Sequence, residues 1–148
     1  MVTIYTDGAS RGNPGPGGFG VVLLANGHRK EIAQGYRLTT NNRMELLAVI
    51  VGLEALKKRD LEVTIYSDSK YVVESVEKGW VFNWDAKPDF ALKKNRDLWK
   101  RFLQVYQFQN VRFIWVKGHA SNIENNRCDI LATQAADGFN LEIDEGYE

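Results

Sequence analysis

Cysteine is almost absent from this sequence of 148 residues. Cys128 is the only one, so we expect neither a disulfide framework nor a zinc site built from thiolates. No apolar run approaches the roughly 18 residues of a membrane span, because two glutamates and a glycine interrupt the longest candidate, residues 44–56. The first residues also lack the basic start and the cleavage site of a signal peptide. These absences favour a protein of a reducing cytoplasm without a membrane partner.

Net charge is absent as well, since 19 basic residues balance 19 acidic ones. The charges are unevenly distributed, however. The last twelve residues hold five carboxylates and no base, which leaves a net charge of +5 on residues 1–136. We expect the acidic segment from about residue 138 to 148 to form a flexible tail.

The stretch between Lys78 and Arg101 is locally basic, with seven bases against three acids, and aromatic residues are interleaved with them. From charge alone, a solvated face is the more common explanation of such a run. A nucleic-acid contact is the alternative.

The remaining composition is that of a globular protein. Hydrophobic residues make up 44% and charged residues 26% of the chain, which is typical of folded domains rather than of disordered ones. The length predicts one domain over residues 1–148, large enough to bury a core. The sequence contains no repeat of solenoid period, no low-complexity tract and no interdomain linker.

Local patterns predict the order strand–strand–strand–helix–strand–helix–helix–strand–helix. A loop rich in glycine and proline, residues 8–18, follows the first strand, and the hairpin signal Asn26-Gly27 joins the next two. We predict strands at residues 2–6, 19–25, 28–37, 62–67 and 111–116, and helices at 69–78, 96–108 and 126–136, with another from Asn41 or Asn42 to about residue 58. A meander followed by crossover connections predicts an α/β fold. Its five-stranded mixed sheet, an antiparallel meander plus parallel strands, would be flanked by helices.

Two of these strands end alike. Ile4-Tyr5-Thr6-Asp7-Gly8 and Ile65-Tyr66-Ser67-Asp68-Ser69 both place a hydroxyl residue and an aspartate after an apolar run. If the strands are parallel neighbours, both carboxylates lie at the carboxyl edge of the sheet, where open sheets bind ligands. Like charges held close together there share either a proton or a cation. The alternative is that Asp7 starts a turn and Asp68 caps the following helix.

Two further carboxylates can each be interpreted either as metal ligands or as ordinary features of a helix start. Glu45 lies early in a helix with an apolar inner face, where it either faces the sheet edge or completes a capping box with Asn42. Asp129 lies early in the last helix, where an acid also suits the helix dipole. Four carboxylates without a cysteine or histidine cluster would form an all-oxygen site, which selects Mg²⁺ or Mn²⁺ over Zn²⁺. Two such ions, roughly 3.5–4 Å apart, clamp the attacking and leaving oxygens of a phosphoryl displacement.

Five segments resemble, in order, the motifs of the type 1 ribonuclease H family. They are Tyr5-Thr6-Asp7-Gly8, residues 12–18, residues 40–45, residues 66–72, and residues 115–120 together with 125–129. The resemblance spans about residues 2–136 and implies the ribonuclease H-like fold. It also implies an endonuclease that hydrolyses the RNA strand of RNA–DNA hybrids by attack of water and leaves 5′-phosphate and 3′-hydroxyl ends. Two Mg²⁺ ions per site are implied, with Mn²⁺ as a substitute. We further expect a cytoplasmic monomer that uses no small-molecule cofactor.

The resemblance also assigns roles to residues at matching positions. The metal-binding catalytic carboxylates would be Asp7, Glu45, Asp68 and Asp129. His119 matches a mobile histidine that helps to move protons or release product, and its residue type suits proton transfer near neutral pH. Contacts with sugars or base edges across the minor groove are implied for Ser10, Asn13, Asn41 and Asn42, and a contact near a DNA phosphate for Thr40. The segment from residue 80 to 96 resembles the family's basic protrusion, in which Trp80, Trp84, Lys87, Lys93, Lys94 and Arg96 would contact the substrate.

The sequence departs from the family pattern at several positions. Lys70, a further candidate for a groove contact, stands where relatives often have an uncharged residue. Asn122 and Asn126 replace a histidine and an acid. The basic protrusion is shorter than in the best-known bacterial members, and we expect no separate hybrid-binding domain.

Two other functions compete with this one. A non-catalytic hybrid-binding module is expected to have lost a metal carboxylate, whereas all four are present. A related DNA nuclease of the same superfamily usually carries extra DNA-binding or multimerising segments, for which 148 residues leave no room. Shared fold does not by itself prove activity.

Overall fold

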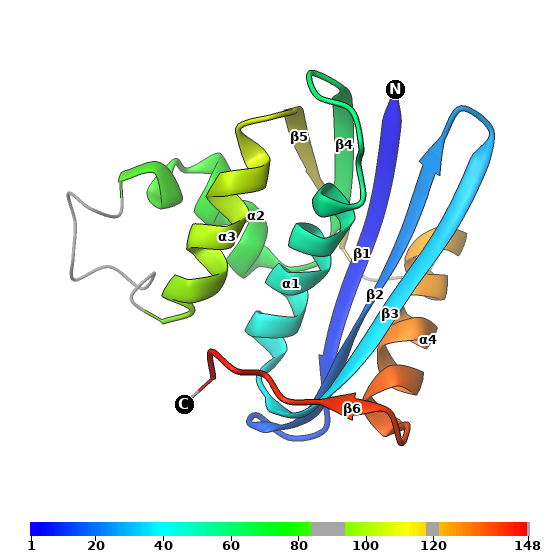
Figure 1. Cartoon of the computed structure of the whole chain (residues 1–148), viewed down its shortest axis with the longest axis vertical. Coiled ribbons are helices and arrows are strands. Elements are labelled where there is room, and N and C mark those ends of the chain that lie inside the picture. Colours follow the sequence, from blue (N-terminus) through cyan, green and yellow to red (C-terminus); the bar gives the residue numbers. More distant parts are fainter. Residues whose placement is uncertain (84–93, 118–121, 148) are drawn as a thin grey trace.

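A six-stranded mixed sheet forms the centre of the molecule (Figure 1). The computed structural model describes residues 1–83, 94–117 and 122–147, with the backbone alone for residues 80 and 83. The strands are β1 (Val2–Ser10), β2 (Gly15–Ala25), β3 (His28–Thr39), β4 (Glu62–Ser67), β5 (Asn110–Trp115) and β6 (Leu141–Glu142). The helices are α1 (Asn41–Glu54), α2 (Lys70–Glu77), the short 3₁₀ helix η1 (Trp80–Asn83), α3 (Arg96–Tyr106) and α4 (Ile123–Asp137).

The strand order is β5-β4-β1-β2-β3-β6. The strands β1, β2 and β3 form the expected antiparallel meander, and β4 and β5 continue the sheet from β1 in parallel pairings. The prediction of an α/β fold with a mixed sheet is therefore confirmed. The sixth strand, β6, pairs with β3 and was not predicted, because a two-residue strand has no alternating pattern to detect.

Several elements begin or end away from their expected positions. The first strand continues to Ser10 and the second begins at Gly15, because Ala9 and Ser10 pair with Gly18 and Gly17 across the meander. The glycine-rich loop is correspondingly short. Helix α1 ends at Glu54 rather than near residue 58. Helix α4 begins three residues earlier than expected.

The early start of α4 has a local cause. The side chain of Asn122 accepts the backbone N–H groups of Glu124 and Asn125, each at 3.1 Å. An asparagine in this position satisfies donors that the first turn of a helix otherwise leaves unpaired. The departure from the family pattern at Asn122 thus supplies the helix cap.

Helices cover the two faces of the sheet unequally (Figure 1). Helix α1 packs on β1 and β2 and touches α2 and α3, whereas α4 packs on the other side against β1, β2 and β3. Ten of the fourteen residues of α1 are buried, so this helix is the centre of the core. Gly20 lets α4 approach closely, because a side chain there would meet the carbonyl oxygen of Cys128. In the part of the chain that the structure describes, no helix has the length and apolarity to cross a membrane.

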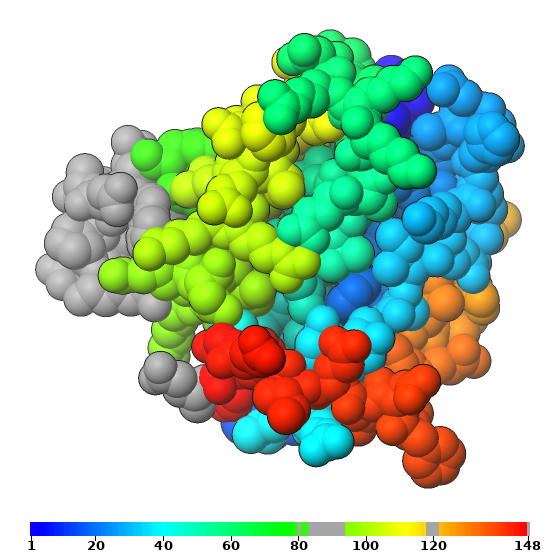
Figure 2. Space-filling model, viewed as in Figure 1, coloured from blue at the N-terminus to red at the C-terminus, as the bar shows by residue number. Residues whose placement is uncertain are grey.

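The acidic segment after α4 lies on the body of the molecule, which differs from the flexible tail that the sequence suggests. It contributes β6 and then runs across the surface, in red in Figure 2. The Asp144 side chain is only 7% exposed and forms an ion pair with Arg43. The Thr39 hydroxyl donates a hydrogen bond to the same carboxylate at 2.6 Å.

Candidate active site

Asp7 and Asp68 extend from neighbouring parallel strands. Tyr5 pairs with Tyr66 in the register of β1 and β4, so each aspartate follows two residues after a paired tyrosine. Asp7 lies within β1, because that strand continues in its pairing with β2 beyond the point where β4 ends. The prediction that Asp7 ends its strand is wrong, whereas the meeting of the two aspartates is confirmed.

Asp68 does not cap the helix that follows it. That cap is Ser69, whose hydroxyl accepts the backbone N–H of Val72 at 3.2 Å. The capping interpretation of Asp68 is therefore wrong, and its carboxylate belongs to the sheet edge.

Glu45 faces the sheet edge as well. Thr40 is the N-cap of α1 and accepts the N–H of Arg43 at 3.3 Å, so neither Asn41 nor Asn42 caps the helix. Glu45 instead accepts the N–H of Gly8 through Oε1 at 2.6 Å.

The contact with Gly8 depends on the close approach of α1 to β1. A side chain at position 8 would collide with the backbone of Met44 and Glu45. The same Gly8 N–H also lies 2.9 Å from Asp7 Oδ1. One backbone donor thus orients two carboxylates.

The three carboxylates of Asp7, Glu45 and Asp68 form one cluster, in which one oxygen from each lies within 4.8 Å of the others. They come from β1, α1 and the turn between β4 and α2. Asp7 and Glu45 are 3% and 5% exposed. Asp129, on α4, is exposed and outside this cluster, but its charge acts on Asp7.

Burial and mutual repulsion both disfavour the ionised form of the carboxylates in this cluster. Burial, followed by the charges of Asp68 and Asp129, raises the pKa of Asp7 from 3.8 to about 8. Burial, followed by the charges of Asp7 and Asp68, raises the pKa of Glu45 well above its usual range. A bound cation would relieve this repulsion. The donor set is entirely oxygen, which fits Mg²⁺ or Mn²⁺.

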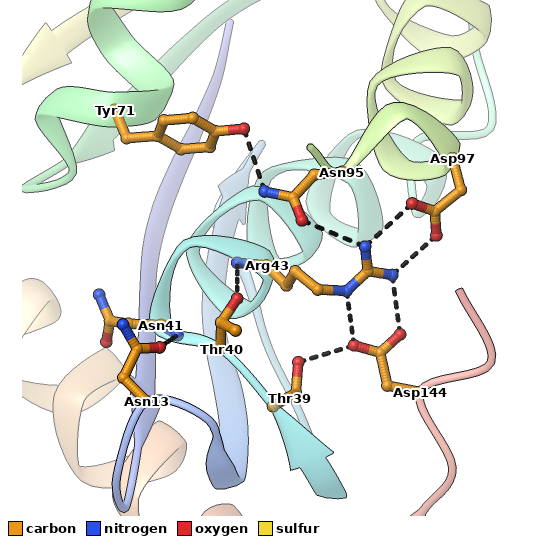
Figure 3. A network of polar contacts seen from close by, with 9 residues as sticks. All are labelled: Asn13, Thr39, Thr40, Asn41, Arg43, Tyr71, Asn95, Asp97 and Asp144. Carbon is orange, nitrogen blue, oxygen red and sulfur yellow. Dashed lines mark hydrogen bonds and ion pairs between the residues drawn. The ribbon is translucent and has the colours of Figure 1, made fainter. Parts of the chain in front are cut away.

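Two of the candidate minor-groove residues, Asn13 and Asn41, meet at the start of α1 (Figure 3). The backbone N–H of Asn41 donates to Asn13 Oδ1 at 3.1 Å, which ties the loop between β1 and β2 to the helix. Asn13, Asn41 and Asn42 are exposed, and Ser10 is half-buried at the end of β1. Thr40 uses its hydroxyl for the helix cap.

The candidate phosphate-binding residues are only partly described. Lys94 and Arg96 are exposed at the start of α3. Lys70, the candidate for a groove contact, is exposed at the first position of α2. The backbone of Trp80 begins η1. Trp84, Lys87, Lys93 and His119 lie outside the described residues.

Arg43 is a central residue that the sequence analysis missed (Figure 3). Its side chain is 2% exposed, yet it forms ion pairs of 2.7 Å with both Asp97 and Asp144. The guanidinium also donates to Asn95 Oδ1 at 3.2 Å, and the amide of Asn95 donates to the Tyr71 hydroxyl at 3.1 Å. A charged residue in the first turn of the otherwise mostly apolar helix α1 is the signal that could have revealed it.

The model of the RNase H family matches residues 1–137. The chain belongs to the RNase H family. A ribonuclease H of Desulforamulus reducens is 57% identical over 147 residues, which cover 97% of this chain and 92% of that protein. The resemblance to the family is thereby confirmed over the whole span in which its motifs occur.

Two solved structures show the same relationship in three dimensions. LC9-RNase H1, described as a type 1 RNase H with the type 2 active-site motif, is 31% identical with a TM-score of 0.80, over 93% of this chain and 72% of that one. LC11-RNase H1, solved in complex with an RNA/DNA hybrid, is 27% identical with a TM-score of 0.72, over 93% of this chain and 97% of that one. The ribonuclease H-like fold is thus confirmed for this chain.

Proposed function

We propose that this chain is a metal-dependent endonuclease that hydrolyses the RNA strand of RNA–DNA hybrids and leaves 5′-phosphate and 3′-hydroxyl ends. The observation that carries the proposal is the cluster of Asp7, Glu45 and Asp68 in a chain 57% identical to a ribonuclease H. A relative solved with an RNA/DNA hybrid supports the substrate class.

Asp7, Glu45, Asp68 and Asp129 are the residues that would hold two Mg²⁺ ions, with Mn²⁺ as a substitute. When bound, such ions lower the pKa of a coordinated water and neutralise charge that develops on the phosphoryl group. The chain's own contribution is orientation. Gly8 fixes the carboxylates of Asp7 and Glu45 with its N–H, and their burial strengthens the electrostatic interactions of the site.

The substrate contacts follow from the surface around this cluster. Asn13 and Asn41 are joined by a hydrogen bond and present carboxamides, which both donate and accept, to sugar hydroxyls and base edges. Ser10 and Asn42 complete this candidate minor-groove surface, and Thr40 would lie near a DNA phosphate. Phosphate contacts would come from bases of the segment 80–96, where each neutralised phosphate favours binding; they are Lys87, Lys93, Lys94 and Arg96, with Trp80 and Trp84 in the same segment of the sequence. Lys70 is a further candidate for a groove contact. His119 would carry a proton to or from the reacting groups.

The proposal also covers the domain organisation, the oligomeric state and the location of the protein. Residues 1–148 act as one catalytic domain, supported by the family match over residues 1–137. The protein works as a monomer without a small-molecule cofactor. It resides in the cytoplasm, where its single cysteine stays reduced.

A strand-labelled cleavage assay tests the proposed function. Hybrid, single-stranded RNA, double-stranded RNA and double-stranded DNA are incubated with the protein in Mg²⁺, in Mn²⁺ and in excess chelator. We expect cutting of the RNA strand of the hybrid alone, and only with a divalent ion. Cutting of duplex DNA at the same rate would favour the related DNA nuclease. Tight hybrid binding without cutting would favour the non-catalytic binding module.

A further inference from the structure

An indole stands exposed at the carboxyl edge of the sheet. Trp115, the last residue of β5, is 40% exposed, whereas Phe113 two residues earlier on the same strand face is buried. Trp115 pairs with Ser67, the last residue of β4. The next residue, Val116, donates its N–H to the Ser67 carbonyl at 2.9 Å. The indole therefore lies beside the turn that connects β4 to α2.

This ring makes two contacts with that turn. Its Nε1 donates to the main-chain carbonyl of Asp68 at 3.3 Å. The Lys70 Nζ lies 5.1 Å from the centre of the indole, which is within the range of a cation–π interaction. One side chain thus touches the backbone of a candidate metal ligand and the ammonium group of a candidate substrate contact.

The charges at the carboxyl edge of the sheet indicate what the Lys70 ammonium group would bind. A phosphodiester carries a negative charge, so a cation beside the cluster of Asp7, Glu45 and Asp68 attracts it. An ammonium group has three donors and no acceptor, so it pairs with phosphate oxygens. Its long aliphatic stem loses rotamer freedom on binding, and contact with the indole restricts the stem before the substrate arrives.

We propose that Trp115 is a positioning residue that holds the Lys70 ammonium at this edge to bind a phosphate of the nucleic-acid substrate. The proposal rests on the proposed function, because it names a further determinant of binding at the same site. It predicts that Trp115 acts through Lys70 rather than independently of it.

A double-mutant cycle tests this dependence. The variants Trp115→Leu, Lys70→Met and the double variant are compared with the original chain in KM and kcat for the hybrid, and in Kd for the hybrid in excess chelator. We expect each single change to raise KM and Kd about threefold, as for removal of one exposed cation–π interaction or one charge. The double variant should match Lys70→Met alone, and kcat should change less than twofold. Lys70→Arg should keep KM near its original value, because a guanidinium also stacks on an indole.

The chain offers a matched control. The Arg59 guanidinium lies 4.0 Å from the centre of the Phe108 ring, before the starts of β4 and β5 and so at the opposite edge of the sheet. Arg59→Met removes the same type of interaction and should leave KM and Kd unchanged. If circular dichroism shows that Trp115→Leu is unfolded, Trp115→Phe takes its place in the cycle. This variant keeps an aromatic face and removes the indole N–H.

The outcomes separate the two proposals. Additive effects of the Trp115 and Lys70 changes would overturn the positioning role, as would unchanged KM and Kd in both single variants. An original chain that binds the hybrid but does not cut it would overturn the proposed function, while the cycle in Kd would still decide the role of Trp115.

Discussion

At Asp7, burial opposes the negative charge of the carboxylate. It is 3% exposed, and its pKa is raised from 3.8 to about 8. Between these two pH values the folded, metal-free protein keeps a proton that the unfolded chain releases. The free energy of unfolding therefore falls as the pH rises from about 4 to about 8. Below pH 4 both states are protonated and this decrease is absent.

Replacement of Asp7 by asparagine removes the ionisation while preserving the shape. In excess chelator at pH 8, we expect Asp7→Asn to raise the midpoint of thermal unfolding by several degrees, since about 1 kcal/mol corresponds to roughly 2–8 °C for domains of this size range. At pH 4 the difference should be much smaller. Calorimetry at the two pH values measures it, and an equal difference at both would contradict the assignment. In Mg²⁺ the same variant should bind the hybrid without turnover.

His119 should contribute less than the carboxylates. An accessory proton carrier contributes about 10²-fold, so we expect His119→Ala to retain a slow but measurable rate of hybrid cleavage. Single-turnover kinetics beside Asp7→Asn make the comparison. If both variants are equally inactive, His119 is an essential group and the accessory role is wrong.

At the scale of elements, the Arg43 guanidinium connects α1, α3 and the segment after β6. Asp144 is the more buried of its two partners, at 7% side-chain exposure against 44% for Asp97. Removing one partner of a buried ion pair leaves charge uncompensated in the interior. This network ties the start of α1, with its candidate substrate contacts, to α3 and to the segment after β6.

Asp144→Asn should therefore lower the free energy of unfolding by about 3–5 kcal/mol, measured by urea denaturation at pH 7. Asp97→Asn should cost less, because solvent screens the exposed partner. Asp97 is partly buried, yet its interaction with Arg43 lowers its pKa. The stabilisation that this ion pair contributes should therefore be present above pH 3.8 and decline as the pH falls further. Asp137→Asn is the control, since that aspartate and Arg11 form an ion pair in which both side chains are 53% exposed. Equal decreases from Asp144→Asn and Asp137→Asn would contradict the importance of burial.

Local sequence patterns were sufficient for the order of the elements and for part of the site. The repeated strand endings brought Asp7 and Asp68 together correctly, because parallel register follows from the crossover connection. The orientation of Glu45 could not be decided from the sequence, since capping-box spacing is present whether or not the side chain forms a cap. The contact with Gly8, made across 37 residues, decides it.

The failures share a physical cause. Strand β6 and the contacts of Asp144 arise from pairings with distant parts of the chain, and neither has a local signature. The end of β1 was placed too early because Asp7-Gly8 is typical of a turn, whereas pairing with β2 extends the strand through it. Tertiary hydrogen bonds overrode the local preference in both cases.

At the scale of the whole molecule, the balanced net charge conceals a division between a basic body and an acidic carboxyl-terminal segment. Asp137 at the end of α4 and Asp144 in that segment form ion pairs with Arg11 and Arg43 of the body. The bases between residues 87 and 96 belong to the basic part of the chain, residues 1–136, whose net charge is +5.

Replacing Lys87, Lys93, Lys94 and Arg96 together by alanine should weaken hybrid binding without changing which strand is cut. Each phosphate that a base neutralises releases about one condensed counterion, so the slope of log affinity against log salt should fall by somewhat less than one unit for each such base removed. KM should rise and kcat change little, because these bases would bind ground and transition states alike. Anisotropy across a salt series measures the slope. An unchanged slope and KM would identify these residues as a solvated face.

The pairing of Arg43 with Asp144 also has a consequence for biosynthesis. The two residues are 101 positions apart, and ribosomes add about 5–20 residues per second. Arg43 is therefore translated roughly 5–20 s before the carboxylate that neutralises it in the interior. Until then, burial of the first turn of α1 leaves this guanidinium with an incomplete set of partners. We therefore expect the start of this helix to pack stably against the sheet only late in synthesis. A chain that ends before residue 144 should have Asp97 as the one carboxylate partner of Arg43 among the contacts described above.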